Sequence, residues 1–245
     1  MKFYRSLGKI EALSFDLDDT LYSNKPVMIA TEASMITYFE LLLLPHLTHA
    51  ITANNKPLVF NFHFWKPFRQ QVLQDNPALC HDVTALRFAT YQLGMQALGI
   101  KPKKINDLVE QAMAEFLTQR CNFTVPHSSH NLLAELAKKV PLVAITNGNV
   151  DMKIIGIDHY FQHAFLAGNG RISKPDNEMF HRASNALNIP CKHILHIGDC
   201  GKADIFGGIR AGLQTAWLST YTVGKPLTVL PHVEIQDITE IQHLV

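Results

Sequence analysis

The fold is decided by FDLDDTL, residues 15–21, which overlaps the end of the apolar run Ile10–Phe15. A short apolar run of this kind is typical of a parallel strand that is buried on both faces. In open α/β sheets, ligands bind beyond the carboxyl ends of the strands, so these acids lie where a site is expected. Asp16 and Asp18 can both face that site if the chain turns between them. Packed carboxyl groups repel one another, and a bound cation relieves the repulsion; the alternative is a turn with helix-capping aspartates.

Four further apolar runs have the length of buried strands, and helical patterns separate them in the C-terminal half of the chain. These runs are Leu142–Ile145, Ala164–Ala167, His193–Ile197 and Thr215–Leu218. One helix is predicted to begin with Ser128 or Ser129 as its cap, and another to span Asp176–Leu187. This alternation of strands and helices indicates an α/β protein with a doubly wound, mostly parallel sheet.

Residues 23–124 follow a different pattern, with helical periodicity and no strand alternation. Helices are predicted at Asn24–Leu44, Asp82–Leu98 and Lys104–Arg120. The segment Pro45–Pro67 is predicted to be irregular, because asparagines and prolines interrupt any pattern there. We therefore predict a core domain of residues 1–22 and 125–245, interrupted just after its first strand by a helical domain of residues 23–124.

Polar motifs also follow the other predicted strands. TNG at residues 146–148 ends one strand and offers a hydroxyl and backbone amides to an anion. Asp199 lies at a strand end and Asp204 on the next turn, and such a pair of oxygen donors suits a hard cation. Lys174 precedes a helix. Each motif alone is compatible with an ordinary turn, a cap or a solvated lysine, but an acid pair, Thr, Lys and a second acid pair in this order would rarely arise by chance.

With these motifs in this order, the chain resembles the haloacid dehalogenase superfamily over a span from Asp16 to Asp204. The resemblance implies a Rossmann-like core whose strands are ordered 3-2-1-4-5, with the Asp16 strand in the centre. The insert at residues 23–124 resembles the helical C1 cap domain of that superfamily. A cap implies closure over the substrate, which excludes water from the reaction.

The resemblance also implies a set of site residues. They are Asp16 and Asp18 for catalysis, Thr146, Asn147 and Lys174 for phosphate binding, and Asp16, Asp18, Asp199 and Asp204 for Mg²⁺. Asp16 would attack phosphorus and form an aspartyl-phosphate. Asp18 would protonate the leaving alcohol and later deprotonate water, while its backbone carbonyl binds the metal. Asp204 would act through water or from outside the ligand shell.

The acid at position 18 distinguishes among the activities of the superfamily. Its ATPases carry Thr there and its dehalogenases lack this second acid, so Asp18 favours a phosphatase, with a phosphotransferase next. A phospho-acceptor signalling module, or a relative that binds without turnover, is the alternative of another class. The order of the motifs and the length of 245 residues disfavour a response-regulator receiver.

Several stretches are similar to the riboflavin-pathway phosphatases of enteric bacteria, which hydrolyse 5-amino-6-(5-phospho-D-ribitylamino)uracil and FMN. These stretches are residues 3–5, 7–8, 15–22, 81–84, 87–88 and 141–149. The segment Leu41–Pro67 and Cys200 depart from that group, so a general sugar-phosphate or nucleotide phosphatase stays open. In the helical domain, Arg87, Phe88 and Tyr91 are candidates for gripping a substrate, since an aromatic ring stacks on a ring and Arg pairs with anionic or carbonyl groups.

Composition narrows the partners. The formal net charge is +1, which provides no global field to attract nucleic acid or an anionic membrane. The densest apolar run, Leu41–Leu44, is far shorter than the roughly 20 residues of a membrane span. We therefore expect a cytoplasmic protein that binds neither nucleic acid nor a membrane. The resemblance described above implies a small phosphorylated metabolite as its partner. The sequence leaves the oligomeric state and any role of Cys200 open.

Overall fold

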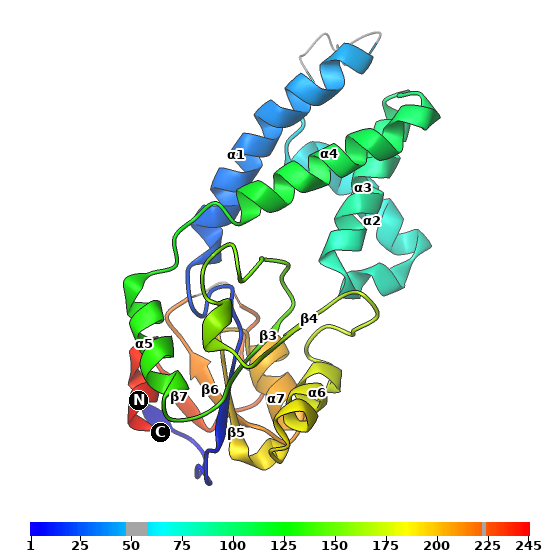
Figure 1. The fold of residues 1–245 in the computed structure, drawn as a ribbon. Helices are drawn as coiled ribbons and strands as arrows, with labels where there is room; N and C mark the ends of the chain where they lie inside the picture. Colours follow the sequence, from blue (N-terminus) through cyan, green and yellow to red (C-terminus); the bar gives the residue numbers. More distant parts are fainter. Residues whose placement is uncertain (48–57, 222–223) are drawn as a thin grey trace. The chain divides into compact units, whose positions relative to one another are not determined.

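The computed structural model describes residues 1–47, 58–221 and 224–245. It divides into two compact units, which are coloured along the chain in Figure 1. Unit 1 consists of Met1–Asn24 and Thr124–Val245, and unit 2 of Lys25–Phe123. Unit 1 contains the sheet, and unit 2 is helical in the part of the chain that the structure describes.

The sheet of unit 1 has seven strands in the order β1-β7-β6-β5-β2-β3-β4. The strands are β1 (Lys2–Phe3), β2 (Ala12–Phe15), β3 (Leu142–Thr146), β4 (His163–Leu166), β5 (Ile194–Gly198), β6 (Gln214–Leu218) and β7 (Val233–Ile235). Strands β2 to β6 are parallel, with β2 in the centre, and they confirm the predicted order 3-2-1-4-5. Strand β7 adds a parallel edge, and β1 pairs with it antiparallel. These two edge strands were not predicted, because runs of two or three residues carry no readable alternation.

Three α-helices belong to unit 1, and they are α5 (His127–Ala137), α6 (Glu178–Leu187) and α7 (Gly207–Arg210). The predicted cap of α5 is wrong, because Pro126 occupies the cap position and makes no side-chain cap bond. The hydroxyl of Ser129 instead donates to the Leu21 carbonyl at 2.6 Å, which ties α5 to the chain just after β2. Met179, Phe180 and Ala183 of α6 pack in an apolar cluster with residues of the sheet.

Shorter helical turns complete the described secondary structure. They are 3-10 turns at Leu44–His46, Pro77–His81, Asp158–Tyr160, Cys191–His193 and Ile238–His243, and a π-helical turn at Gly201–Phe206. The π-helical turn follows β5 directly, so it belongs to the sheet edge at which the acidic motifs were predicted. Rare helical turns of this type are often found at functional sites.

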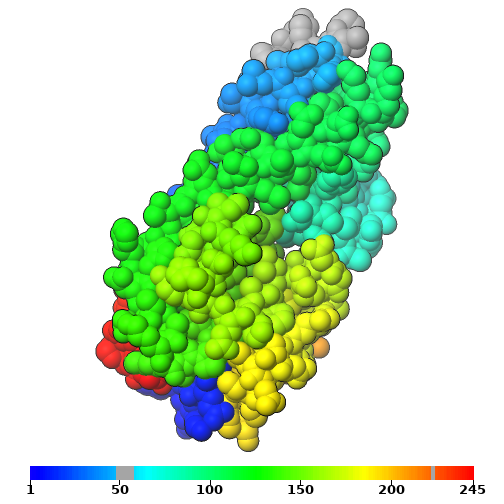
Figure 2. Space-filling model, viewed as in Figure 1, coloured from blue at the N-terminus to red at the C-terminus, as the bar shows by residue number. Residues whose placement is uncertain are grey.

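Unit 2 is built from α1 (Asn24–Leu43), α2 (Phe62–Asp75), α3 (Val83–Ala97) and α4 (Pro102–Arg120). In the space-filling view, atoms of α1 and α4 adjoin one another (Figure 2), and the Thr31 hydroxyl on α1 donates to the Gln119 carbonyl on α4 at 3.2 Å. Asp82 caps α3 by accepting from the backbone amides of Thr84 and Ala85. Among the described residues of this unit, an apolar cluster rich in aromatic rings forms the core.

The predicted irregular segment Pro45–Pro67 is corrected in part, because α2 begins at Phe62 and contains Pro67. Residues 48–57 of that segment lie outside the described residues. A proline inside a helix removes one backbone hydrogen bond, at a cost of about 3 kcal/mol. The burial of Trp65 and Val72 on the inner face of α2 stabilises the helix through tertiary packing. Local sequence patterns do not include this contribution.

Helix α1 and the turn after it, Asn24–His46, are long and apolar enough to cross a membrane by length and composition alone. Core helices of globular proteins can have the same length and apolar composition. Here one face of α1 is buried in the core of unit 2, through Val27, Thr31, Met35, Phe39 and Leu43. Packing in this core therefore accounts for the apolar residues at the buried positions of α1, whereas Ile29 and Leu41 remain exposed.

Candidate active site

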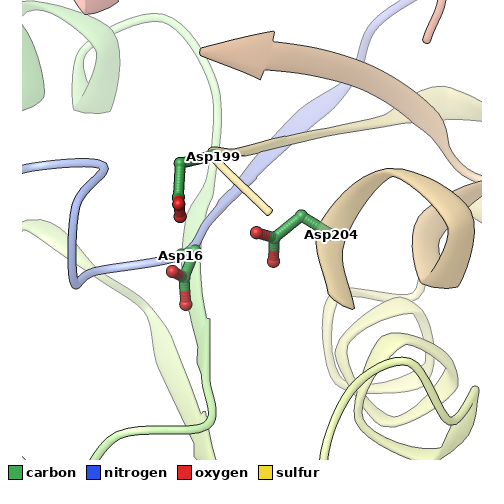
Figure 3. A group of neighbouring side chains, drawn as sticks. All are labelled: Asp16, Asp199 and Asp204. Atoms are coloured by element: carbon green, nitrogen blue, oxygen red, sulfur yellow. The ribbon is translucent and has the colours of Figure 1, made fainter. Parts of the chain in front are cut away.

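Three acids meet at the carboxyl edge of the sheet. Asp16 follows β2, Asp199 follows β5, and Asp204 lies in the π-helical turn. Figure 3 shows their carboxyl groups gathered around a common point, and a ligand oxygen of each lies within 4.8 Å of the others. All three side chains are buried. The convergence follows from topology, since β2 and β5 are parallel neighbours and their ends meet at one edge.

Lys174 provides the positive charge at the centre of this group. Its Nζ donates to Asp16 Oδ1 at 2.7 Å, to Asp204 Oδ1 at 2.6 Å and to the Ile145 carbonyl at 2.6 Å. Burial acts against its charge, but the two carboxylates outweigh burial and hold the pKa of Lys174 above its ordinary value. Asn147 fixes the backbone of this lysine, because its amide nitrogen donates to the Lys174 carbonyl at 3.0 Å and its amide oxygen accepts from the Lys174 N–H at 2.8 Å.

Asp18 lies beside the end of β3 and is not a member of the three-acid group. The Tyr22 hydroxyl donates to Asp18 Oδ1 at 2.8 Å. A Cβ atom on Gly148 would lie 2.6 Å from Asp18 Oδ2, so position 148 requires a glycine for this approach. Thr146 Oγ1 accepts from the Gly148 N–H at 3.0 Å. The TNG motif thus forms the wall against which the Asp18 carboxylate rests.

Burial and neighbouring charges shift the pKa values of the three acids in different directions. Burial raises the pKa of Asp16 to about 7, although the Lys174 ammonium opposes it. Burial, and after it the charges of Asp204 and Asp16, raise the pKa of Asp199 to about 8. For Asp204, burial also acts upward, but Lys174 and His196 outweigh it and hold its pKa below the ordinary value. The group therefore lacks positive charge, and a cation would supply it.

These residues fit a divalent hard cation. Carboxylate oxygens are the donors that Mg²⁺ prefers, and soft or imidazole ligands are absent from the group. Asp204 already accepts from Lys174 and His196 at Oδ1 and from the Cys200 N–H at Oδ2, at 2.6, 3.2 and 2.9 Å. Because both of its carboxylate oxygens already accept hydrogen bonds, Asp204 is suited to a position farther from the cation than Asp16 and Asp199. The Lys174 ammonium leaves the site one positive charge against Asp16, Asp199 and Asp204 together.

A cavity of about 250 Å³ opens over these residues in unit 1. Most of the site residues predicted in the core domain line this cavity, together with four further residues. The full lining consists of Asp16, Asp18, Asp19, Asn147, Lys174, Asp199, Cys200, Ala203, Asp204 and Gly224. Thr146 is 1% exposed and lies behind this wall. The structure thus brings the predicted residues of four separate strand ends into one place.

Sequence reasoning missed two polar residues that support the site. Tyr22 holds Asp18, as described above. His196 is fully buried on β5, where its Nε2 lies 3.2 Å from Asp204 Oδ1 and its Nδ1 lies 2.9 Å from the Ser14 hydroxyl. Burial lowers the pKa of His196, so the neutral ring donates to Asp204 and accepts from Ser14. A polar pair within two apolar strands was the available signal.

The candidates in the helical domain separate into two environments. Arg87 and Tyr91 line a second cavity, of about 430 Å³, whose walls belong to unit 2. An Arg87 guanidinium N–H donates to the Tyr91 hydroxyl at 3.3 Å. Phe88 does not line that cavity and instead packs against the apolar cluster of unit 2. Arg87 and Tyr91 are therefore the two of these candidates that face an open volume.

Comparison with known proteins agrees with this geometry. The sequence profile of the haloacid dehalogenase-like hydrolases matches residues 10–212. Over the full length of both chains, the protein is 36% identical to 5-amino-6-(5-phospho-D-ribitylamino)uracil phosphatase YigB of Escherichia coli (strain K12). It is 27% identical to pyrimidine 5'-nucleotidase YjjG of the same organism, over 65% of this chain and 71% of that one.

Among solved structures, a 2-haloacid dehalogenase from Pseudomonas syringae pv. Tomato DC3000 is similar to this chain with a TM-score of 0.83. The alignment has 26% sequence identity and covers 96% of this chain and 97% of that one. The fold, the acid-lined edge of the sheet and the matched profile define a hydrolase with a Rossmann-like α/β core. The chain belongs to the haloacid dehalogenase-like hydrolase family, which confirms the resemblance drawn from its motifs, and within that family it is a phosphatase.

Proposed function

We propose that the protein is a Mg²⁺-dependent phosphomonoesterase that acts through an aspartyl-phosphate on 5-amino-6-(5-phospho-D-ribitylamino)uracil and FMN. The observation that carries the chemistry is the convergence of Asp16, Asp199 and Asp204 around Lys174, with Asp18 beside them. The substrate is supported by the relative that shares 36% identity over both full chains.

Asp16 is the nucleophile in this proposal. Attack of one carboxylate oxygen on phosphorus forms an acyl-phosphate bond and breaks the bond between phosphorus and the ester oxygen of the substrate. A carboxylate is a weak nucleophile, so position and charge neutralisation supply much of the rate. Lys174 provides both, because it holds Asp16 Oδ1 at 2.7 Å and carries a buried positive charge toward the incoming phosphate.

Asp18 is the acid and base. It gives a proton to the leaving alcohol and later takes one from the water that attacks the aspartyl-phosphate. The Tyr22 hydroxyl, 2.8 Å from Asp18 Oδ1, fixes the rotamer of the carboxyl group. Phosphate oxygens are bound by Lys174 and the backbone amide of Asn147, with the hydroxyl of Thr146 as the third predicted donor.

Asp16, Asp199 and the backbone carbonyl of Asp18 would hold Mg²⁺, with Asp204 behind them. When bound, the ion neutralises charge on the phosphoryl oxygens and keeps the nucleophile ionised. Unit 2 is the predicted C1 cap, and it supplies the surface that selects the substrate. A cytoplasmic location follows from the same proposal, since the substrates are intracellular metabolites.

A second candidate is a general nucleotide or sugar-phosphate phosphatase, which the 27% identity to a pyrimidine 5'-nucleotidase favours. Phosphate release separates the two candidates. The purified protein is supplied with 5-amino-6-(5-phospho-D-ribitylamino)uracil, FMN, uridine 5'-monophosphate and ribose 5-phosphate, each with Mg²⁺ or with EDTA. We expect kcat/KM for the first two to exceed the others by about tenfold or more, and EDTA to abolish release.

Equal turnover of all four compounds would replace the flavin-pathway assignment with the general one. Release that persists after EDTA and extensive dialysis would contradict the metal dependence. No release from any phosphomonoester, by a protein whose circular dichroism shows it to be folded, would overturn the proposed function altogether.

A further inference from the structure

Unit 2 contains a cavity that the chemistry of unit 1 does not use. Its volume of about 430 Å³ falls in the range of small-molecule sites, and all its lining residues belong to unit 2. The inner wall is aromatic and buried, with Phe39, Trp65 and Tyr91 packed at ring-centroid distances of 4.7 to 4.9 Å. A preformed aromatic wall of this kind suits a flat ring.

The position of Trp65 is held from two sides. Its indole N–H donates to the Phe60 carbonyl at 3.1 Å. On α3, a Cβ atom at Gly94 would lie 2.5 Å from Trp65 Cζ3, so the indole occupies the space that any larger residue would need. A glycine inside a helix costs about 1 kcal/mol relative to alanine. Its use here is explained by the close approach of the ring that forms the cavity wall.

Apolar side chains are exposed at the same cavity. Phe62, the first residue of α2, lines it and is 54% exposed, and Ile29 of α1 lines it and is 60% exposed. Large apolar side chains that gather at the rim of a cavity mark a surface that a ligand covers. The Phe62 ring is therefore available to a flat ligand at the mouth, in addition to the buried wall.

Arg87 supplies the directional donor. Its guanidinium carbon lies 3.7 Å from the centroid of the Phe116 ring, and both residues line the cavity. The Arg87 Nε atom is buried and has no hydrogen-bond partner among the described residues. A buried N–H without a partner is destabilising, and a ligand carbonyl oxygen would provide the missing acceptor. Lys25, Lys66 and Arg69 add positive charge to the lining, against Glu32.

We propose that this cavity of unit 2 binds the uracil-type ring of the substrate, with Arg87 donating to a ring carbonyl and Phe62 covering the ring face. The identity of the ring rests on the proposed function. A pyrimidinedione has two carbonyl acceptors at the edge of a flat ring, which matches one free guanidinium N–H beside aromatic walls.

The test uses riboflavin, which carries a pyrimidinedione in its ring system and has no phosphate. The chain has two tryptophans, Trp65 in this cavity and Trp217 in unit 1, so Trp217→Phe leaves Trp65 as the reporter. Riboflavin should quench Trp65 emission in a saturable manner. Arg87→Met and Phe62→Ala in this background should each raise the dissociation constant about tenfold. Leu41→Ala, at a more exposed apolar residue of unit 2 that does not line the cavity, should change it less than about twofold.

Phe62→Ala guards against loss of folding, because an exposed side chain can be removed with little effect on stability. Trp65 emission that does not change with riboflavin would overturn the inference. So would dissociation constants of the Phe62→Ala and Arg87→Met variants that equal that of the Trp217→Phe background. Saturable quenching by glycerol 2-phosphate in place of riboflavin would also overturn it, because the cavity would then select an anion. Riboflavin binding is read without turnover, so it stands or fails independently of phosphate release.

Discussion

The two units hold their cationic side chains in opposite ways. In unit 1, the Lys174 ammonium has three partners within 2.7 Å, two of which are carboxylates. In unit 2, Arg87 lies against the Phe116 ring and keeps a buried N–H without a hydrogen-bond partner among the described residues. The first arrangement carries more negative than positive charge, and the second leaves one buried donor unpaired within the described part of the chain.

In the function proposed above, this difference separates the chemistry in unit 1 from the selection of the substrate in unit 2. Reaction at phosphorus needs groups that do not move, so a buried network with satisfied donors is suited to it. Choice among substrates needs donors that are satisfied only by the correct ligand, since an unpaired buried donor then penalises every other compound. Substitutions in unit 1 should therefore affect turnover of all substrates, and those in the unit 2 cavity should affect the preference among them.

The largest effect is expected from Asp16→Asn. Without the nucleophilic carboxylate, kcat should fall by about 10⁴-fold or more for every substrate, because the amide that replaces it is a much weaker nucleophile. Phosphate release measures the loss, and circular dichroism checks the fold. Asp151→Asn, an exposed acid of unit 1, is the matched control and should keep nearly full activity. Substantial turnover by Asp16→Asn would contradict the nucleophile assignment.

Lys174→Met should give the largest loss of stability. It leaves Asp16 and Asp204 buried without their cation, and removal of one partner from a buried ion pair costs about 3–5 kcal/mol. Urea unfolding measures the free energy of unfolding. The exposed Lys153→Met should change it by less than about 0.5 kcal/mol. A small effect of Lys174→Met would mean that water or a cation already compensates the acids.

Mg²⁺ should change both the stability and its pH dependence. The pKa values of Asp16 and Asp199 are raised to about 7 and 8, so the metal-free folded state binds more protons than the unfolded state between about pH 4 and pH 8. Stability of the metal-free protein should therefore fall as pH rises through this window, by at most about 1.4 kcal/mol per pH unit for each titrating group.

A bound Mg²⁺ favours the ionised acids and should flatten that slope. At a concentration about 100 times its dissociation constant, the ion should stabilise the protein by about 2.7 kcal/mol. Urea unfolding in EDTA and in Mg²⁺, between about pH 5 and pH 8, measures both effects. A metal-free protein whose stability rises with pH across this window would contradict the shifts of Asp16 and Asp199.

The smallest of these effects concerns selection by unit 2. Arg87→Met should lower the ratio of kcat/KM for FMN to that for ribose 5-phosphate by about tenfold, because only FMN offers a ring carbonyl to the guanidinium. Steady-state phosphate release gives the ratio. Lys103→Met, an exposed cation of α4 outside the cavity, serves as the control. An unchanged ratio in Arg87→Met would remove Arg87 from substrate selection.

Prediction from sequence succeeded where one residue pattern has one structural meaning. The acids after β2 and β5 were predicted as site residues because each acid follows directly on the end of a short apolar run. It failed at α2, where Pro67 suggested an irregular chain and the burial of Trp65 outweighs that local preference. It also missed Tyr22 and His196, which form hydrogen bonds with the side chains of Asp18 and Asp204. The directions of those side chains are defined only by the folded backbone.

By itself the sequence determined the parallel sheet and the edge at which Asp16, Thr146 and Asp199 lie, because consecutive parallel strands place their carboxyl ends on one side. Only the tertiary structure decided that Lys174 pairs with both Asp16 and Asp204, and that Arg87 and Phe62 share a cavity with Trp65. Periodicity gives the face of an element, whereas distances between side chains of different elements arise when those faces pack.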